Sequence, residues 1–99
     1  MVVVAGTVKI KPERRAEAQQ LALRMATATR AESGCLAYQF YADLTDPATF
    51  FFFEEWENEE ALNQHFRTPH MAEFQKHLPG LLAGAISVKR YTIQAVSQM

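Results

Sequence analysis

The sequence has little cysteine, no excess of either charge and no long hydrophobic run. A single cysteine, Cys35, among 99 residues excludes an internal disulfide and is typical of a reducing compartment. Ten basic against eleven acidic residues give no reason to expect nucleic acid or an anionic membrane as a partner. No segment approaches the length that crosses a bilayer, and the N-terminal MVVVAGTVKIK lacks the basic lead and cleavage site of a signal peptide. We therefore expect a cytoplasmic protein with a small-molecule ligand.

Linkers, repeats and low-complexity segments are also absent, so residues 1–99 are expected to form one domain. Hydrophobic residues make up 48% of the chain, which is enough for a core. A domain of this size buries only part of its chain surface, and it gains stability from oligomerisation.

The first third of the chain predicts a strand followed by a helix. Residues 2–11 alternate between apolar and polar side chains and are rich in β-branched residues, which is typical of a strand. Pro12 suits the first turn of a helix, and Gly34 is expected to end it. The apolar residues between them fall on one helical stripe: Ala18, Leu21, Ala22, Met25 and Ala28.

The remainder predicts two strands, a divided helical arm and a last strand. Residues 36–44 and 49–57 are expected to pair as an antiparallel hairpin. Asn58 can cap one helix, and Thr68-Pro69 begins another. Residues 85–96 give the last strand. The order β-α-β-β-α-β, with a split second helix, predicts an α+β ferredoxin-like fold in which helices cover one face of an antiparallel sheet.

The predicted strand at 49–57 is apolar on both sides. Phe50 and Phe52 alternate with Phe51 and Phe53, so one pair faces the helices and the other would lie in water. An exposed aromatic sheet face marks association, and two such sheets stacked face to face bury both. We therefore expect a homodimer.

Several pieces of the sequence resemble the antibiotic biosynthesis monooxygenase family of dimeric α/β barrels. They are Glu32-Ser33-Gly34-Cys35, Tyr38, Glu54-Glu55-Trp56 and His65-Phe66-Arg67-Thr68-Pro69-His70-Met71. The family includes quinol monooxygenases, a branch that processes autoinducer-2 and, more distantly, haem-degrading monooxygenases. The resemblance covers nearly the whole chain, and it implies a dimer of ferredoxin-like protomers with a pocket between sheet and helices.

In such a fold the end of the third strand is the candidate site. Phe52, Glu54 and Trp56 share one side of that strand, and if they face the helices, Glu54 and Trp56 lie at the pocket beneath His65. Glu54 beside His65 would shift the pKa of both groups, as a general acid–base pair requires. The same pair could instead form a buried polar clamp between helix and sheet. His65, Glu54 and Trp56 are therefore candidate catalytic residues, with both interpretations open.

Four further residues are candidates for binding the substrate: Phe52, Tyr38, His70 and Phe74. Tyr38 is expected to share one side of its strand with Leu36 and Phe40. No metal is expected, because His65 and His70 straddle a helix break and His77 lies two turns beyond His70. No nucleotide-binding glycine loop, haem-attachment motif or Cys-x-x-Cys occurs, so no cofactor is expected.

Two branches of the family depend on residues that differ here. The aromatic-polyketide oxygenases carry an asparagine four residues before the tryptophan of the third strand, where this chain has Phe52. Haem-degrading members need an asparagine, a tryptophan and a histidine at positions that fall on Gly6, His65 and Gln75. Haem degradation is therefore not expected.

The resemblance implies a small cofactor-independent monooxygenase that deprotonates a phenol or quinol, whose anion then reduces O₂. A dry apolar pocket, a base and donors for the anion would be required. The alternatives are an isomerase of a small carbonyl metabolite, as in the autoinducer-processing branch, and a non-catalytic dimer that binds an aromatic ligand.

Overall fold

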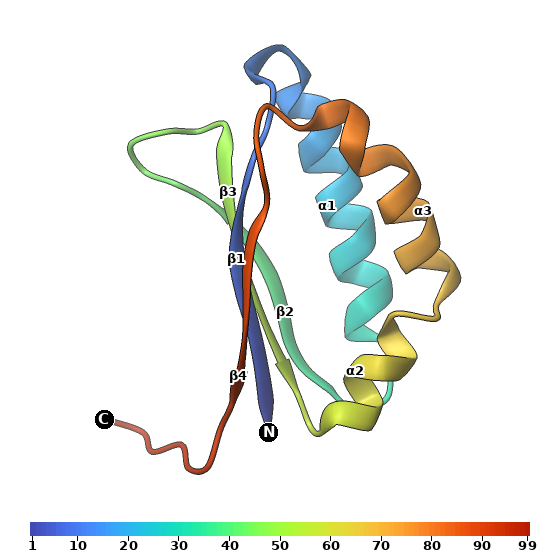
Figure 1. The fold of residues 1–99 in the computed structure, drawn as a ribbon, viewed down its shortest axis with the longest axis vertical. Helices are drawn as coiled ribbons and strands as arrows, with labels where there is room; N and C mark the ends of the chain where they lie inside the picture. Colours follow the sequence, from blue (N-terminus) through green and yellow to red (C-terminus); the bar gives the residue numbers. More distant parts are fainter.

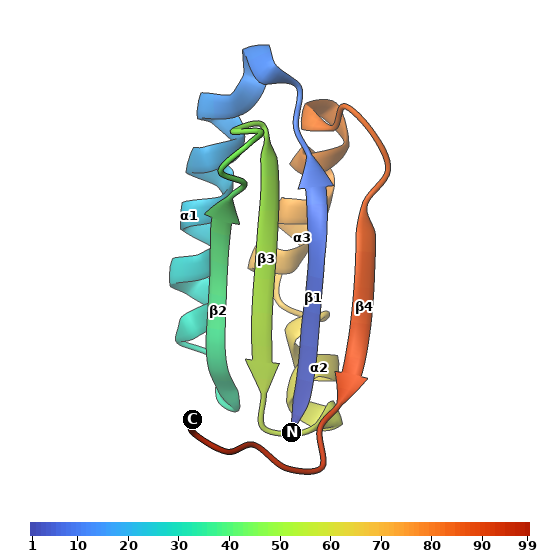
Figure 2. The same cartoon turned by 90° about the vertical axis from the view of Figure 1, so that its left-hand side faces the viewer.

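A four-stranded antiparallel sheet carries helices on one face in the computed structural model, which describes residues 1–99 (Figure 1). The strands are β1 (Val2–Lys9), β2 (Cys35–Ala42), β3 (Thr49–Trp56) and β4 (Ser87–Thr92). Their order is β2-β3-β1-β4, and every neighbouring pair is antiparallel (Figure 2). The ferredoxin-like fold expected from the sequence is confirmed.

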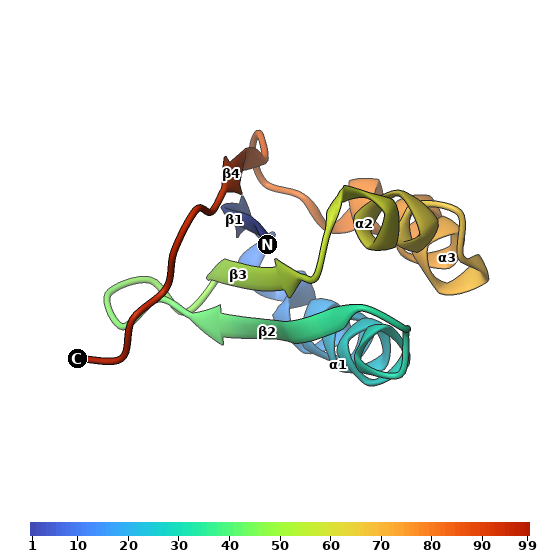
Figure 3. The same cartoon turned by 90° about the horizontal axis from the view of Figure 1, so that it is seen from below.

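The helices form a second layer on one side of the sheet (Figure 3). They are η1 (Pro12–Arg14), α1 (Arg15–Arg30), α2 (Glu59–His65), α3 (Pro69–His77) and η2 (Leu78–Leu81). None of them is long and apolar enough to cross a membrane. The predicted split of the second helical arm is confirmed, and its two caps form as expected. Asn58 Oδ1 accepts the N–H of Ala61 at 2.9 Å, and Thr68 Oγ1 accepts that of Met71 at 3.2 Å.

The buried stripe of α1 differs from the prediction in its last turn. Ala26 and Thr29 are buried, whereas Ala28 is only half-buried. The prediction that Gly34 ends this helix is wrong, because α1 ends at Arg30 and Gly34 lies in the turn that leads into β2. Gly34 has a φ of 84°, which favours glycine, and a Cβ at this position would lie 2.6 Å from the Cβ of Ala61.

The sides of β3 are as predicted. Phe52, Glu54 and Trp56 are buried beneath the helices, as is Phe50. Phe51 points to the opposite side and is 39% exposed. That side of the sheet, called the open face here, also carries Tyr41 and Tyr91, which are 51% and 45% exposed. No helix covers this face of the sheet (Figure 1), so these three aromatic side chains lie outside the helical layer.

A β-bulge changes the start of β2. Cys35 pairs with Trp56 and Ala37 with Glu55, so Leu36 is an extra residue on this strand. The predicted placement of Leu36 beside Tyr38 is wrong, since Leu36 is 58% exposed while Tyr38 is buried. The bulge restores the alternation that points Tyr38 and Phe40 at the helices.

Gly6 lies in the buried row of β1 between Val4 and Val8. It pairs with Phe52 on one side and Val88 on the other. A Cβ at Gly6 would lie 2.1 Å from the carbonyl oxygen of Ser87 and 2.9 Å from Cζ of Phe52. The glycine therefore lets β4 and the Phe52 ring approach the backbone of β1 closely.

Candidate functional site

A cavity of about 280 Å³ lies between the sheet and α3. Most of its walls are apolar, and they are formed by Val4, Val8, Tyr38, Phe40, Phe52, Phe66, Met71, Phe74, Leu78, Ile86 and Val88. Phe66, Ile86 and Val88 are 46%, 41% and 51% exposed, which places the mouth of the cavity beside them. Its polar side chains, apart from the tyrosine hydroxyl, are Glu54, His65 and Gln75. An apolar cavity with a few polar groups is typical of a small-molecule site.

Three polar atoms in the cavity walls have no hydrogen-bond partner within the chain: His65 Nε2, Glu54 Oε2 and Tyr38 Oη. Thr29 Oγ1 is the only side-chain nitrogen or oxygen atom that lacks a hydrogen-bond partner and is also sealed from solvent. The three atoms named above lack partners too, so each of them must keep some solvent-accessible surface. The residues that carry these three atoms all line the cavity, so they are the cavity's candidates for hydrogen bonds to a ligand.

Glu32 holds both histidines of the split helical arm. Its Oε2 lies 2.7 Å from His65 Nδ1 and 2.6 Å from His70 Nε2. An ionised carboxylate only accepts hydrogen bonds, so each of these ring nitrogens carries its proton. Neutral His65 then has its lone pair on Nε2, the ring nitrogen that has no partner within the chain. The ring is 1% exposed and lies 4.8 Å, centroid to centroid, from that of Trp56.

Glu54 accepts the indole N–H of Trp56 at 2.9 Å through Oε1. Burial raises its pKa from 4.5 to about 7; the Trp56 hydrogen bond opposes this shift, and the charge of Glu32 adds to it. Burial also raises the pKa of Tyr38, with a further contribution from the charge of Glu54. The Tyr38 hydroxyl therefore stays protonated and can donate a hydrogen bond into the cavity.

The predicted site residues fall into two groups. Five of them line the cavity: Phe52, Tyr38, Phe74, Glu54 and His65. Trp56 and His70 do not: Trp56 is fully buried and donates to Glu54, and His70 contacts Glu32. The predicted pairing of Glu54 with His65 is replaced by two separate pairs, in which His65 contacts Glu32 and Glu54 contacts Trp56. Glu54 and His65 share the cavity but hold different partners.

Glu32 is the residue to which the sequence analysis gave no role. It appeared only as the first residue of Glu32-Ser33-Gly34-Cys35. Gly34 was the sequence feature that could have pointed to Glu32. A glycine required at a tight turn indicates that the turn has a fixed shape, and a fixed turn holds neighbouring side chains such as Glu32 in one direction. No metal was expected at the three histidines because of their spacing in the sequence. The donor set that the structure assembles is Glu32, His65 and His70.

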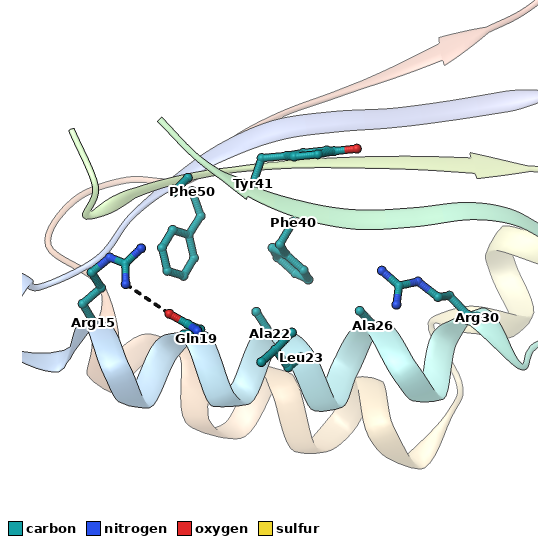
Figure 4. Close-up of a pocket in the computed structure, with 10 residues that line it drawn as sticks. Arg15, Gln19, Ala22, Leu23, Ala26, Arg30, Phe40, Tyr41 and Phe50 are labelled. Carbon is teal, nitrogen blue, oxygen red and sulfur yellow. Dashed lines mark hydrogen bonds between the residues drawn. The ribbon is translucent and has the colours of Figure 1, made fainter. Parts of the chain in front are cut away.

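A second hollow, of about 240 Å³, lies between α1 and β2 (Figure 4). Both of its arginines are engaged within the chain. Arg15 donates to the carbonyl oxygen of Pro47 at 2.8 Å and to Gln19 Oε1 at 3.1 Å, and Arg30 donates to the carbonyl oxygen of Tyr38 at 2.9 Å. No carboxylate, histidine or cysteine lines this hollow. The cavity beneath α3 is therefore the better candidate for chemistry.

The family model for antibiotic biosynthesis monooxygenase matches residues 1–77, from β1 to the end of α3. The chain belongs to this family. The matched residues include the cavity's polar side chains Glu54, His65 and Gln75, and also Glu32 and His70, which contact each other beside it.

Similar proteins cover the chain almost completely. The Synechocystis protein sll1783 is 42% identical over 92 residues, which are 93% of this chain and 63% of that protein. This chain thus spans less than two thirds of sll1783. YcnE of Bacillus subtilis is 31% identical over 90 residues, 91% of this chain and 95% of YcnE. The solved structure of Rv0793 from Mycobacterium tuberculosis has a TM-score of 0.90 at 26% identity, covering 98% of both chains.

Proposed function

We propose that the protein is a homodimeric monooxygenase that oxidises a phenol or quinol with O₂ and needs no bound cofactor. The observation that carries the proposal is the Glu32–His65 pair, which leaves the second ring nitrogen of a buried histidine at an apolar cavity. Membership of the antibiotic biosynthesis monooxygenase family supports it. Two relatives, YcnE and Rv0793, are provisionally named monooxygenases.

His65 is the base in this proposal. Its Nε2 takes the hydroxyl proton of the substrate. The carboxylate of Glu32 stabilises the resulting imidazolium through its hydrogen bond with Nδ1. Tyr38 donates a hydrogen bond to the resulting anion. The apolar walls around them exclude water, which strengthens both interactions.

The substrate anion is the reductant. It passes electrons to O₂, and one oxygen atom then bonds to a ring carbon that carries hydrogen. This carbon becomes a carbonyl and the second oxygen atom leaves as water. A phenol plus O₂ thus gives a quinone plus water, and the ring supplies all four electrons that O₂ accepts. The proton that His65 removed leaves in that water.

A second copy of residues 1–99, which we take as one domain, is proposed to cover the open face. Tyr41, Phe51 and Tyr91 expose aromatic surface there. Two open faces related by a two-fold axis would bury this surface, because a two-fold interface joins the same patch on both copies. The cavity lies on the other side of the sheet, so its mouth stays open in such a dimer.

Oxygen consumption with a panel of phenols and quinols tests the proposed activity. We expect one O₂ consumed per substrate and a quinone product that contains one labelled atom when the gas is isotopically labelled. Product with no labelled oxygen, or turnover that continues unchanged under nitrogen, contradicts a monooxygenase. Tight binding of every panel member with no turnover would indicate a ligand-binding protein instead.

One observation favours a second candidate, an isomerase of a small carbonyl compound. Glu54, with its pKa raised to about 7, reaches the same cavity as His65. Two proton-transferring side chains in one cavity can remove a proton at one carbon and return it at another. Turnover under nitrogen, with exchange of substrate hydrogen for solvent deuterium, would select this activity.

A further inference from the structure

Three metal-ligating side chains meet beside the cavity: Glu32, His65 and His70. The atoms that they offer all lie within 4.8 Å of one another. The residues come from the turn after α1, the end of α2 and the first turn of α3. Two imidazoles and a carboxylate form a donor set that Zn²⁺ and neighbouring transition ions bind. The fold thus brings Glu32 to two histidines that follow it by 33 and 38 residues in the sequence.

Small side-chain movements would bring these atoms to the spacing of a tetrahedral ion site. Metal–ligand bonds of about 2.1 Å place neighbouring ligand atoms roughly 3.4 Å apart. Glu32 Oε2 lies 2.7 Å from His65 Nδ1 and 2.6 Å from His70 Nε2 because a proton now lies between each pair. An ion in place of those protons requires the carboxylate to withdraw by less than about 1 Å and the two histidine nitrogens, up to 4.8 Å apart, to approach each other by roughly 1.4 Å. Glu32 lies in a turn and the side chain of His70 is 25% exposed, so rotation of these two side chains supplies the movement.

Access and charge both suit a cation. The side chain of His65 is 1% exposed, that of Glu32 12% and that of His70 25%, so an ion enters from the His70 side. The same side leaves a fourth coordination position for water. No lysine or arginine pairs with Glu32, and its ion-pair partners are the two histidines alone. The carboxylate charge is therefore not neutralised by a fixed cation.

The geometry points to a binding site for Zn²⁺, or a divalent ion of similar preference, that reverses the hydrogen-bonding role of His65 in the cavity. A neutral imidazole has one N–H. When the ion takes the lone pair of Nδ1, the proton must lie on Nε2, so the cavity-facing atom changes from acceptor to donor. The ion then removes the base from the cavity without entering it. This effect on catalysis rests on the proposed function, whereas binding of the ion does not.

Binding is tested on the full chain after removal of metal by a chelator. Calorimetry with Zn²⁺ and visible spectra with Co²⁺ are expected to show one ion per chain and the intense bands of tetrahedral Co²⁺. Mg²⁺, which prefers six oxygen ligands, is expected not to compete. His70→Gln removes one ligand and is expected to weaken Zn²⁺ binding by about a hundredfold or more. Glu32→Gln gives the same test from another element, should the first variant fold poorly.

His77 provides the matched control. Its Nε2 lies 2.9 Å from Glu73 Oε1 on the exposed side of α3, so it is the other histidine–carboxylate pair of the chain. His77→Gln is expected to keep the affinity and the Co²⁺ spectrum of the wild type. Absence of stoichiometric binding, or its loss in His77→Gln but not in His70→Gln, would overturn the site.

The catalytic effect is measured separately. Saturating Zn²⁺ is expected to lower wild-type oxygen consumption at least tenfold, with less effect on His70→Gln. One ion bound per chain without any change in turnover would leave the site established and would refute His65 as the base. Inhibition without binding at this site would refute the site and leave the base in place.

Discussion

Glu32 Oε2 lies 2.7 Å from His65 Nδ1, although 33 residues separate the two in the sequence. The same oxygen lies 2.6 Å from His70 Nε2. One carboxylate therefore joins the turn after α1 to both halves of the split helical arm. The break between α2 and α3 is what makes this possible, since it turns the chain so that both imidazoles face one point.

His65→Ala separates a catalytic role from a clamp. If His65 is the base, turnover should fall about a hundredfold or more while the protein stays folded. If it only fixes helix to sheet, the variant should lose about 1–3 kcal/mol of folding free energy, because Glu32 loses a donor, and activity should follow the folded fraction. Turnover and melting temperature measured on one preparation decide between these results.

A double-variant cycle tests whether Glu32 acts through His65. Glu32→Gln alone is expected to lower kcat by roughly ten- to a hundredfold with little change in KM, because the neutral amide no longer stabilises the imidazolium. In the His65→Ala background the same change should add little, as for residues that act as a unit. Glu73→Gln, on the exposed pair of α3, serves as control. Independent, multiplicative effects would contradict the coupling.

Glu54→Gln is expected to remove a pH dependence of stability between about pH 4.5 and pH 7. Burial raises the pKa of Glu54 from 4.5 to about 7. As the pH rises through this window, the unfolded chain releases a proton that the folded chain keeps, so the free energy of unfolding falls. At 1.36 kcal/mol per pKa unit the loss is about 2–4 kcal/mol.

Urea unfolding of both proteins at fixed concentration, from about pH 4 to pH 8, measures this effect. The glutamine can still accept the Trp56 N–H bond but does not titrate, so the histidines contribute equally to both curves. The variant should gain stability relative to the wild type as the pH rises. A constant difference would mean that Glu54 ionises with an ordinary pKa.

Phe51→Asp is expected to convert the proposed dimer to monomer. A two-fold interface would place two buried carboxylates at its centre, which should raise the dissociation constant by at least about a hundredfold. Sedimentation velocity at micromolar concentration provides the measurement. Leu23→Asp is the control, since Leu23 is 54% exposed on α1, in the helical layer. A wild type that sediments only as monomer would refute the dimer itself.

Gly34→Ala is expected to cost about 2–4 kcal/mol of folding free energy, because alanine is strained at a φ of 84° and its Cβ would lie 2.6 Å from that of Ala61. Gly80→Ala is the matched change at a site with no atom within 4 Å, and it should be neutral or slightly stabilising. Chemical denaturation compares the two. Equal effects would remove the steric argument.

The parts of the fold that the sequence predicted depend on local patterns. The alternation in β1, the caps at Asn58 and Thr68 and the two-sided β3 each act over a few residues, so their signals survive without tertiary context. The bulge at Leu36 and the Glu32–His65 pair depend on how distant strands and helices meet. Glu54 was placed correctly at the cavity, but its partner was not, because Trp56 is two residues away on the same strand and satisfies it first.

Gly6 limits how this cavity can change during evolution. Any side chain at this position meets the backbone oxygen of Ser87 at 2.1 Å, and a backbone atom within a sheet cannot move aside. The wall that β1 and Phe52 form is therefore costly to reshape without a shift of β4, and a new ligand is accommodated more easily from the opposite wall. Met71, Phe74 and Leu78 form that wall on α3 and η2 and are only partly buried, so they tolerate exchange. Descendants with different substrates are expected to diverge at these three positions while the strand that faces them stays the same.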